Sequence, residues 1–257
     1  METDRALEAL IASPKYRGVY RGAVERVYRE MLRRYKPKEA EKAARAELHR
    51  ITGAFLTPGD LKKARALLDE AVSGDGNALT RVLSLHASTR ERLLDLAALY
   101  DRALPALGSP KTVLDLACGL NPLYLGSLGL AVCGVELQTD AANLVNQWAE
   151  ALDWDVRVTP GDLVEDVPLP EADATLVMKL LPLLDKQLPG GGAALLERLQ
   201  SKRALVTFPT RTLSGRNVGM KEHYEASFEK NLPFAARILD KFTVPGELCY
   251  ILEMDRR

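Results

Sequence analysis

Three acidic residues lie where apolar, β-rich runs of this sequence end, and their spacing could build a ligand site. Asp115 and Glu136 stand near the ends of two such runs, and Asp162 follows a third. If the runs are parallel strands, their carboxyl ends meet at one edge of a sheet, where open α/β sheets bind ligands. After Asp115 the chain turns through Ala117 and Gly119, whose small side chains let a ligand approach the backbone closely.

The chemistry of these acids favours a nucleoside ligand. Glu136 lies about twenty residues after the small-residue turn, the position from which an acid accepts the hydroxyls of a ribose. Asp162 would add an acceptor for an adenine amine at the same edge. Because the turn lacks a G-x-G-x-x-G pattern, a nicotinamide or flavin pyrophosphate is disfavoured. A ligand with ribose and adenine but no phosphate fits better, and S-adenosylmethionine (SAM) is such a ligand.

The second half of the chain predicts the sheet that would position these residues. Its β-rich runs are TVLDLA (112–117), AVCGVEL (131–137), DVRVTP (155–160), ATLVMK (174–179), RALVTFP (203–209), ARILDKFTV (236–244) and LCYILEM (248–254). Helical stretches between several of them predict a Rossmann-like α/β fold with a mainly parallel sheet. Only PGE separates the last two runs, so we expect a hairpin there and one antiparallel strand.

The first half reads as helices. Apolar residues recur every three or four positions over 20–35, and TPGD (57–60) has the form of a helix N-terminus, with Thr57 as the cap. Further helices are expected over 38–50, 57–72, 78–85 and 89–104. We therefore predict an all-helical domain over 1–106 and a SAM-binding domain over 107–257.

Composition limits the class of protein. The 257 residues are 47% hydrophobic and 27% charged, as in ordinary globular proteins. No apolar run is long enough for a membrane span, and METDRALEAL has no secretory pattern, so we expect a cytoplasmic protein with no membrane partner. We also expect the protein to be monomeric. The cysteines, Cys118, Cys133 and Cys249, are expected to be buried and reduced, and the histidines lack metal-ligand spacing, so no metal is expected.

The charge is distributed unevenly, although the net charge is zero. Residues 1–106 carry 20 Lys and Arg against 15 Asp and Glu, and residues 15–50 carry 12 against 5. A basic helix face is a candidate contact surface for phosphates, so we predict that the helical domain over 1–106 binds RNA. Its candidate residues are Arg26, Arg29, Arg33, Arg34 and Lys36. The alternative is a solvated face with internal ion pairs to Glu30, Glu39 and Glu41.

Five segments, in order along the chain, resemble one enzyme family. They are GAFLTP (53–58), LSLHASTRERL (83–93), VLDLACGLNPL (113–123), MKLLPLLDKQ (178–187) and TFPTRTLSGRNVGM (207–220). The sequence resembles the ribosomal RNA methyltransferases that modify N7 of guanine 1405 in bacterial 16S rRNA and confer aminoglycoside resistance. The segments span most of the chain and are more specific than a general SAM motif.

The resemblance implies particular site residues. Cofactor contacts are expected at Phe55, His86, Ala87, Ser88, Arg92, Ala117, Gly119, Glu136, Asp162, Leu163, Met178 and Gln187. Arg92 would pair with the methionine carboxylate of SAM, and Lys179 would lie beside the reaction centre. Independently of the resemblance, Arg211 and Arg216 lie in the loop after the run over 203–209, on the substrate side of the expected sheet, and we expect them to add RNA contacts. This chain has Glu136 where the family carries Asp, and its SGRNVGM loop also differs.

The implied reaction needs no general base, because guanine N7 has a lone pair and no proton. Catalysis then comes from positioning the two reactants. We expect His86 to act by shape rather than by titration, with a core histidine as the alternative. The implied function is SAM-dependent methylation of guanine 1405 in the 30S subunit, giving resistance to 4,6-disubstituted deoxystreptamine aminoglycosides. Methylation of another rRNA nucleotide and a non-catalytic ribosome-binding factor stay open as alternatives.

Overall fold

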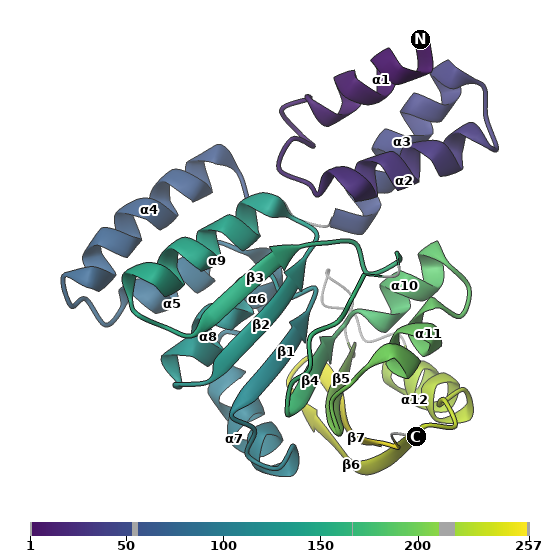
Figure 1. The fold of residues 1–257 in the computed structure, drawn as a ribbon. Helices are drawn as coiled ribbons and strands as arrows, with labels where there is room; N and C mark the ends of the chain where they lie inside the picture. The colour runs from purple at the N-terminus through teal and green to yellow at the C-terminus, as the bar shows by residue number, and fades with distance from the viewer. Residues whose placement is uncertain (1, 53–55, 166, 211–218, 256–257) are drawn as a thin grey trace.

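A seven-stranded sheet forms the centre of the molecule (Figure 1). The computed structural model describes residues 2–52, 56–165, 167–210 and 219–255, and every structural statement below concerns these residues. The strands are β1 (Thr112–Leu116), β2 (Ala131–Glu136), β3 (Val156–Pro160), β4 (Ala174–Met178), β5 (Arg203–Pro209), β6 (Ala236–Val244) and β7 (Glu247–Met254). Their order is β3-β2-β1-β4-β5-β7-β6, and β7 is antiparallel to both of its neighbours. The predicted strands, the terminal hairpin and the Rossmann-like fold class are confirmed.

The strands at the centre are covered on both faces, as parallel strands must be. β4 is buried along its whole length, whereas the edge strand β6 alternates between covered and exposed positions and buries only Phe242 fully. Along β1, Val113 packs into the core on one face, and Leu114 and Leu116 pack into the core on the other. Side chains alternate between faces in a strand, so Asp115 points to the same side as Val113.

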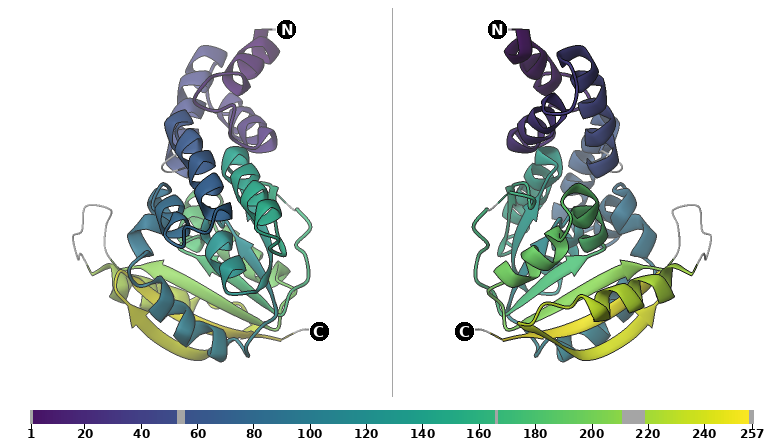
Figure 2. Two further views of the ribbon diagram at one scale, coloured as in Figure 1. Left: turned by 90° about the vertical axis from the view of Figure 1, so that its left-hand side faces the viewer. Right: turned by 90° about the vertical axis from the view of Figure 1, so that its right-hand side faces the viewer.

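Helices form one layer on each face (Figures 1 and 2). The layer on the Val113 side comprises α4 (Pro58–Val72), α5 (Ala78–Leu83), α7 (Leu96–Ala106), α8 (Asn121–Ser127) and α9 (Thr139–Ala151). The opposite layer comprises α10 (Leu181–Gln187), α11 (Gly191–Arg198) and α12 (Met220–Lys230). Trp148, on α9, is fully buried in the first layer and donates its indole N–H to the carbonyl of Ala64. This tryptophan therefore serves packing.

Three helices form a unit with a core of its own. They are α1 (Glu2–Ile11), α2 (Arg21–Leu32) and α3 (Pro37–Thr52). In Figures 1 and 2 this unit stands beyond one end of the sheet, whereas α4 packs against α9, α5 against α8 and α7 against β6. The two-domain division after residue 106 stays a prediction, and we refer to α1–α3 as the helical unit.

A local signal in the sequence decides where α4 begins. Thr57 caps α4: its hydroxyl accepts from the amide of Asp60, whose carboxylate accepts from the amide of Thr57 in return, as TPGD predicted.

The prediction of a single helix over 89–104 is wrong. The chain forms α6 (Ala87–Arg92), turns, and starts α7 at Leu96. The turn lets α6 face the carboxyl edge of the sheet while α7 packs onto its side.

One cysteine prediction is also wrong. Cys118 and Cys249 are buried, but Cys133 is exposed, because the helices on its face of the sheet leave this position of β2 open to solvent. Among the described residues, no helix is long and apolar enough to cross a membrane. Within the same residues, no three His, Cys, Asp or Glu side chains are grouped so that they could hold a metal ion.

Candidate active site

The carboxyl ends of β1, β2 and β4 meet at one edge of the sheet, and the strand order reverses between β1 and β4. This is the position at which open α/β sheets bind ligands. Ala117 directly follows β1, has φ 53° and is exposed, and Lys179 directly follows β4 and has φ 55°. Positive φ is unfavourable for residues other than glycine, and such strain concentrates at functional sites.

Gly119 brings the turn after β1 against the next strand. Its backbone N–H donates to Glu136 Oε2 at 2.8 Å, and its φ is 53°. A Cβ at this position would lie 2.8 Å from Cε1 of His86, so glycine is required by both conformation and space. The Gln138 amide donates to the other oxygen, Glu136 Oε1, at 2.9 Å. Burial raises the pKa of Glu136, while the backbone N–H donors lower it and hold the carboxylate in place.

Asp115 is buried, and neighbouring side chains engage its carboxylate beneath the loop that follows β1. Asn121 Nδ2 donates to Asp115 Oδ2 at 2.6 Å and to the hydroxyl oxygen of Tyr100 at 2.7 Å. Burial raises the pKa of Asp115 to about 7, although the hydrogen bond from Asn121 and the charge of Arg92 act in the opposite direction. Asp115 therefore orients the loop after β1 through its hydrogen bond with Asn121.

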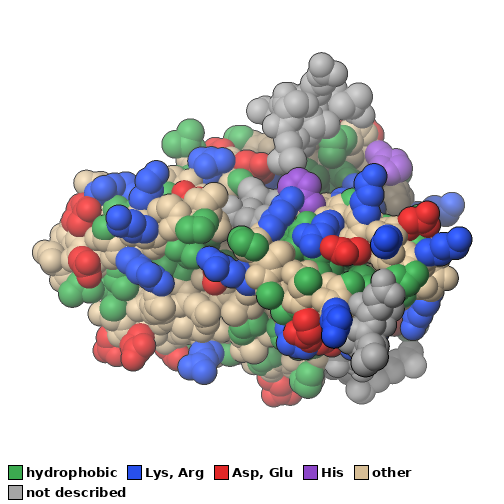
Figure 3. All heavy atoms as spheres, turned by 90° about the horizontal axis from the view of Figure 1, so that it is seen from above, with side chains coloured by type: hydrophobic (Ala, Val, Ile, Leu, Met, Phe, Trp, Pro, Cys, Tyr) green, Lys and Arg blue, Asp and Glu red, His purple; other side chains and the backbone are tan. Residues whose placement is uncertain are grey.

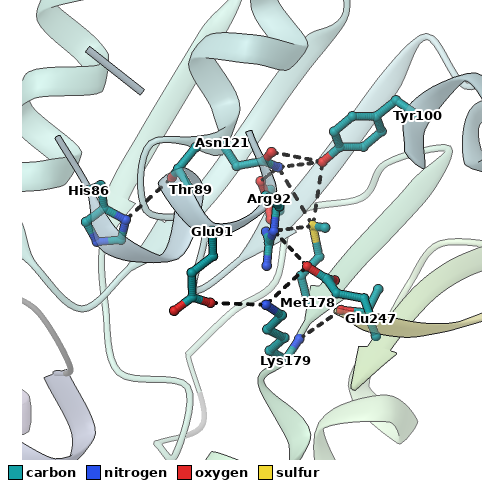
Figure 4. A network of polar contacts seen from close by, with 11 residues as sticks. His86, Thr89, Glu91, Arg92, Tyr100, Asn121, Met178, Lys179 and Glu247 are labelled. Carbon is teal, nitrogen blue, oxygen red and sulfur yellow. Dashed lines mark hydrogen bonds and ion pairs between the residues drawn. The ribbon is translucent and has the colours of Figure 1, made fainter. Parts of the chain in front are cut away.

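The α6 segment places His86 and Arg92 beside this edge (Figure 4). His86 is buried, and its Nδ1 lies 3.5 Å from the hydroxyl of Thr89. Burial, with the charges of Arg92 and Arg90, lowers the pKa of His86 to about 4, so the ring is neutral at pH 7. Ala87 is half-buried, and Ser88 is exposed.

A buried carboxylate that sequence reasoning missed holds the cations of the site together. Glu247 Oε1, at the start of β7, accepts from Arg92 Nε at 3.0 Å and lies 3.3 Å from Lys179 Nζ (Figure 4). Lys179 also pairs with Glu91 at 3.3 Å, and Arg92 Nη1 lies 3.5 Å from the Met178 sulfur. The available signal was an acid at the head of an apolar strand, directly after the Pro-Gly turn.

At the far end of the same edge, Asp162 and Gln187 lie close together. Both are joined by Arg26, whose Nε donates to Asp162 Oδ2 at 2.6 Å and whose Nη2 donates to Gln187 Oε1 at 2.9 Å. Leu163 is buried beside them. The assignment of Arg26 to an exposed basic face is therefore wrong: its side chain is 15% exposed and points into the rim of the site.

The other basic residues of the predicted RNA face are exposed. Arg29, Arg33, Arg34 and Lys36 are all open to solvent. Arg29 pairs with Glu25 at 2.7 Å and Arg34 with Glu30 at 2.8 Å, so the alternative of internal ion pairs is partly realised. Figure 3, seen from above, shows Lys and Arg side chains spread over this end of the molecule with acidic side chains between several of them. Phe55, Arg211 and Arg216 lie outside the described residues.

The fold and the edge of acidic side chains define the class of protein: a Rossmann-like, SAM-dependent methyltransferase. Within that class, the chain belongs to the family described as ribosomal RNA methyltransferase (FmrO), whose model matches residues 12–251.

Relatives and solved structures agree over nearly the whole chain. A 16S rRNA (guanine(1405)-N(7))-methyltransferase from Serratia marcescens is 42% identical over 255 residues, covering 98% of this chain and 99% of the relative. One of the same description from Frankia casuarinae is 36% identical, covering 97% and 93%. The crystal structure of the 16S rRNA methyltransferase RmtF in complex with S-adenosyl-L-homocysteine (SAH) superposes with a TM-score of 0.92 at 49% identity, covering 98% of both chains. The 16S rRNA methylase RmtB gives a TM-score of 0.87 at 37% identity, with the same coverage.

Proposed function

We propose that this protein transfers the methyl group of SAM to N7 of guanine 1405 in 16S rRNA of the 30S subunit. The modification would confer resistance to 4,6-disubstituted deoxystreptamine aminoglycosides. The observation that carries the proposal is full-length similarity to methyltransferases of that description, joined to a sheet edge with buried acceptors at Glu136 and Asp162. As a ribosome-modifying enzyme, the protein would act in the cytoplasm.

The polar side chains at this edge of the sheet suit the groups that SAM presents. Glu136 has each oxygen engaged by one backbone N–H, and a carboxylate has about four acceptor sites, so it can also accept ribose hydroxyls. Asp162 and Gln187 supply polar atoms for the adenine end. Arg92 uses Nε for Glu247, and its guanidinium has further donors for the methionine carboxylate. When bound, SAM supplies a methyl group on a positively charged sulfur.

The residues around the reaction centre suit transfer to a nitrogen that carries no proton. The lowered pKa of about 4 makes His86 a weak base, and Lys179 is paired with Glu247 and Glu91, so neither is set up as a general base. Their contribution is to position the reactants and exclude water. Lys179, as a cation at the end of β4, would orient the target base or its phosphate. The base must be flipped out or its helix opened, because N7 lies in the deep major groove of A-form RNA.

The central test is methyl transfer from tritium-labelled SAM to purified 30S subunits. Primer extension after borohydride–aniline cleavage should stop at position 1405. The matched control is a 30S subunit with adenine at 1405, which should stay unlabelled. A stop elsewhere would support the alternative of another rRNA nucleotide, and binding without labelling would support a non-catalytic ribosome-binding factor. Light scattering of the same preparation tests the expected monomeric state.

The exposed part of the basic face provides a second test. Exchanging Arg29 and Arg33 for Glu should weaken 30S binding and lower the slope of log affinity against log salt by about 2, while SAM affinity is unchanged. The matched control exchanges Lys202 and Arg237 for Glu. Both are exposed around a depression between the start of β5, the start of β6 and the end of β7. If both pairs weaken binding equally, net charge rather than this face governs the interaction.

A further inference from the structure

Arg26 is placed unlike the other basic residues of its helix. α2 buries Val24, Val27 and Tyr28 in the core of the helical unit, while Arg29 faces solvent. Arg26 lies between these two faces, and its side chain leaves the unit and reaches the edge of the sheet. Its third interaction is a long contact of 3.9 Å from Nη1 to Glu30 on its own helix. Both of its short hydrogen bonds go to the other part of the molecule.

The two acceptors of Arg26 come from segments that are separate in the sequence. Asp162 follows β3, and its second oxygen, Oδ1, accepts from the amide of Val164 at 3.1 Å. Gln187 ends α10, and its amide nitrogen donates to the carbonyl of Leu183 at 3.3 Å. One planar guanidinium therefore fixes both side chains at once, which a point charge cannot do as well. Both acceptors are among the expected cofactor contacts.

The helical unit is docked so that Arg26 is held at this place. The amide of Tyr20, just before α2, donates to the carbonyl of Leu137 at 2.8 Å, and Val19 forms a β-bridge with Gln138. A Cβ on Gly18 would lie 2.2 Å from Asp140 Oδ2, so the backbone of the unit approaches the β2–α9 connection closely. These contacts lie next to Glu136, at the same end of β2.

We propose that Arg26 is a positioning residue of the cofactor site, supplied by the helical unit, that holds Asp162 and Gln187 in the arrangement that binds adenosine. The inference rests on the proposed function, since it takes the cofactor to be SAM. Asp162 is almost fully buried, and Arg26 supplies its short charge-assisted hydrogen bond. With Arg26 and the Val164 amide bound, the carboxylate keeps acceptor capacity for a further donor. The helical unit thus completes the cofactor site in addition to contacting RNA.

The experiment measures SAH affinity of the full-length protein by calorimetry for Arg26→Gln and Arg26→Lys. Arg26→Gln should raise the Kd about tenfold, the value of one hydrogen bond to a charged group, and Arg26→Lys should fall between Gln and wild type. The matched control is Arg21→Gln on the same helix, where Arg21 is exposed and pairs with Glu8 and Glu25. It should stay within about twofold of wild type.

A kinetic measurement separates positioning from a general structural lesion. With 30S subunits as acceptor, Arg26→Gln should raise the KM for SAM while kcat at saturating SAM stays within about twofold, because the reacting groups are untouched. If both Arg26 variants bind SAH as wild type does, or more tightly, the inference is overturned and the proposed function stands. If Arg26→Gln does not fold, Arg26→Lys decides by the same criterion. Wild-type protein that fails to bind SAH would overturn the proposed function itself.

Discussion

Glu247→Gln tests whether the negative charge of the buried Glu247 carboxylate stabilises the folded protein. Glu247 is 1% exposed and accepts from Arg92 and Lys179, and the Arg92 side chain is itself 8% exposed. Gln keeps the shape and one acceptor oxygen but removes the negative charge. Arg92 is then a nearly buried cation without its counter-charge, and such an uncompensated buried charge is strongly destabilising.

The expected cost follows from this burial. Removing one partner of a buried pair costs about 3–5 kcal/mol, and the acceptor kept by Gln brings the estimate to about 2–4 kcal/mol. For a chain of this size, that corresponds to a fall in Tm of about 5–15 °C. Burial raises the pKa of Glu247, but Arg92 and Lys179 together lower it below its ordinary value. A carboxylate with a lowered pKa stabilises the fold above its unfolded pKa, so the difference between wild type and variant should be full above about pH 5 and shrink as the pH falls through the folded pKa.

The assay is urea unfolding of wild type and Glu247→Gln between pH 3.5 and about pH 8. The matched control is Glu253→Gln on the same strand, where Glu253 forms an exposed pair with Arg237 and should contribute less than about 1 kcal/mol. Equal losses in the two variants would refute the reasoning. A loss in Glu247→Gln that does not shrink at low pH would refute the electrostatic part of it.

Three further predictions concern separate features. In the folded protein, Asp115 with its pKa of about 7 holds a proton that the unfolded chain releases, so stability should fall from about pH 4 to pH 7. Asp115→Asn should flatten the pH dependence of the unfolding free energy over that window, and an unchanged slope would contradict this. Gly119→Ala forces a Cβ against His86 at positive φ, so it should cost about 1–3 kcal/mol of stability and weaken SAH binding. Gly129→Ala, also at positive φ but in open space, should lose stability only, and equal SAH affinity in the two variants would contradict the close approach. Cys133 should react with a thiol reagent in the native protein and the other two cysteines only on unfolding, and native labelling of all three would refute the assigned burial.

Much of the fold could be predicted because its signals are local. The seven strands are apolar runs, and the hairpin follows from the Pro245–Gly246 turn, in which Gly246 has a φ of 81°. The capping box at Thr57 is complete within four residues. The short helices α8 and α10 were missed because a helix of seven residues has too few turns to show a period.

The sequence by itself determined which residue types stand at the strand ends and which family the chain resembles, since strands, turns and motifs are properties of neighbouring residues. Only the tertiary structure decided the partners of these residues. Glu247 lies 155 positions from Arg92, and Arg26 lies 136 positions from Asp162, so no periodicity relates them. Burial then decided the charge states, because the loss of solvent is the largest cause of the pKa shifts of Asp115 and His86.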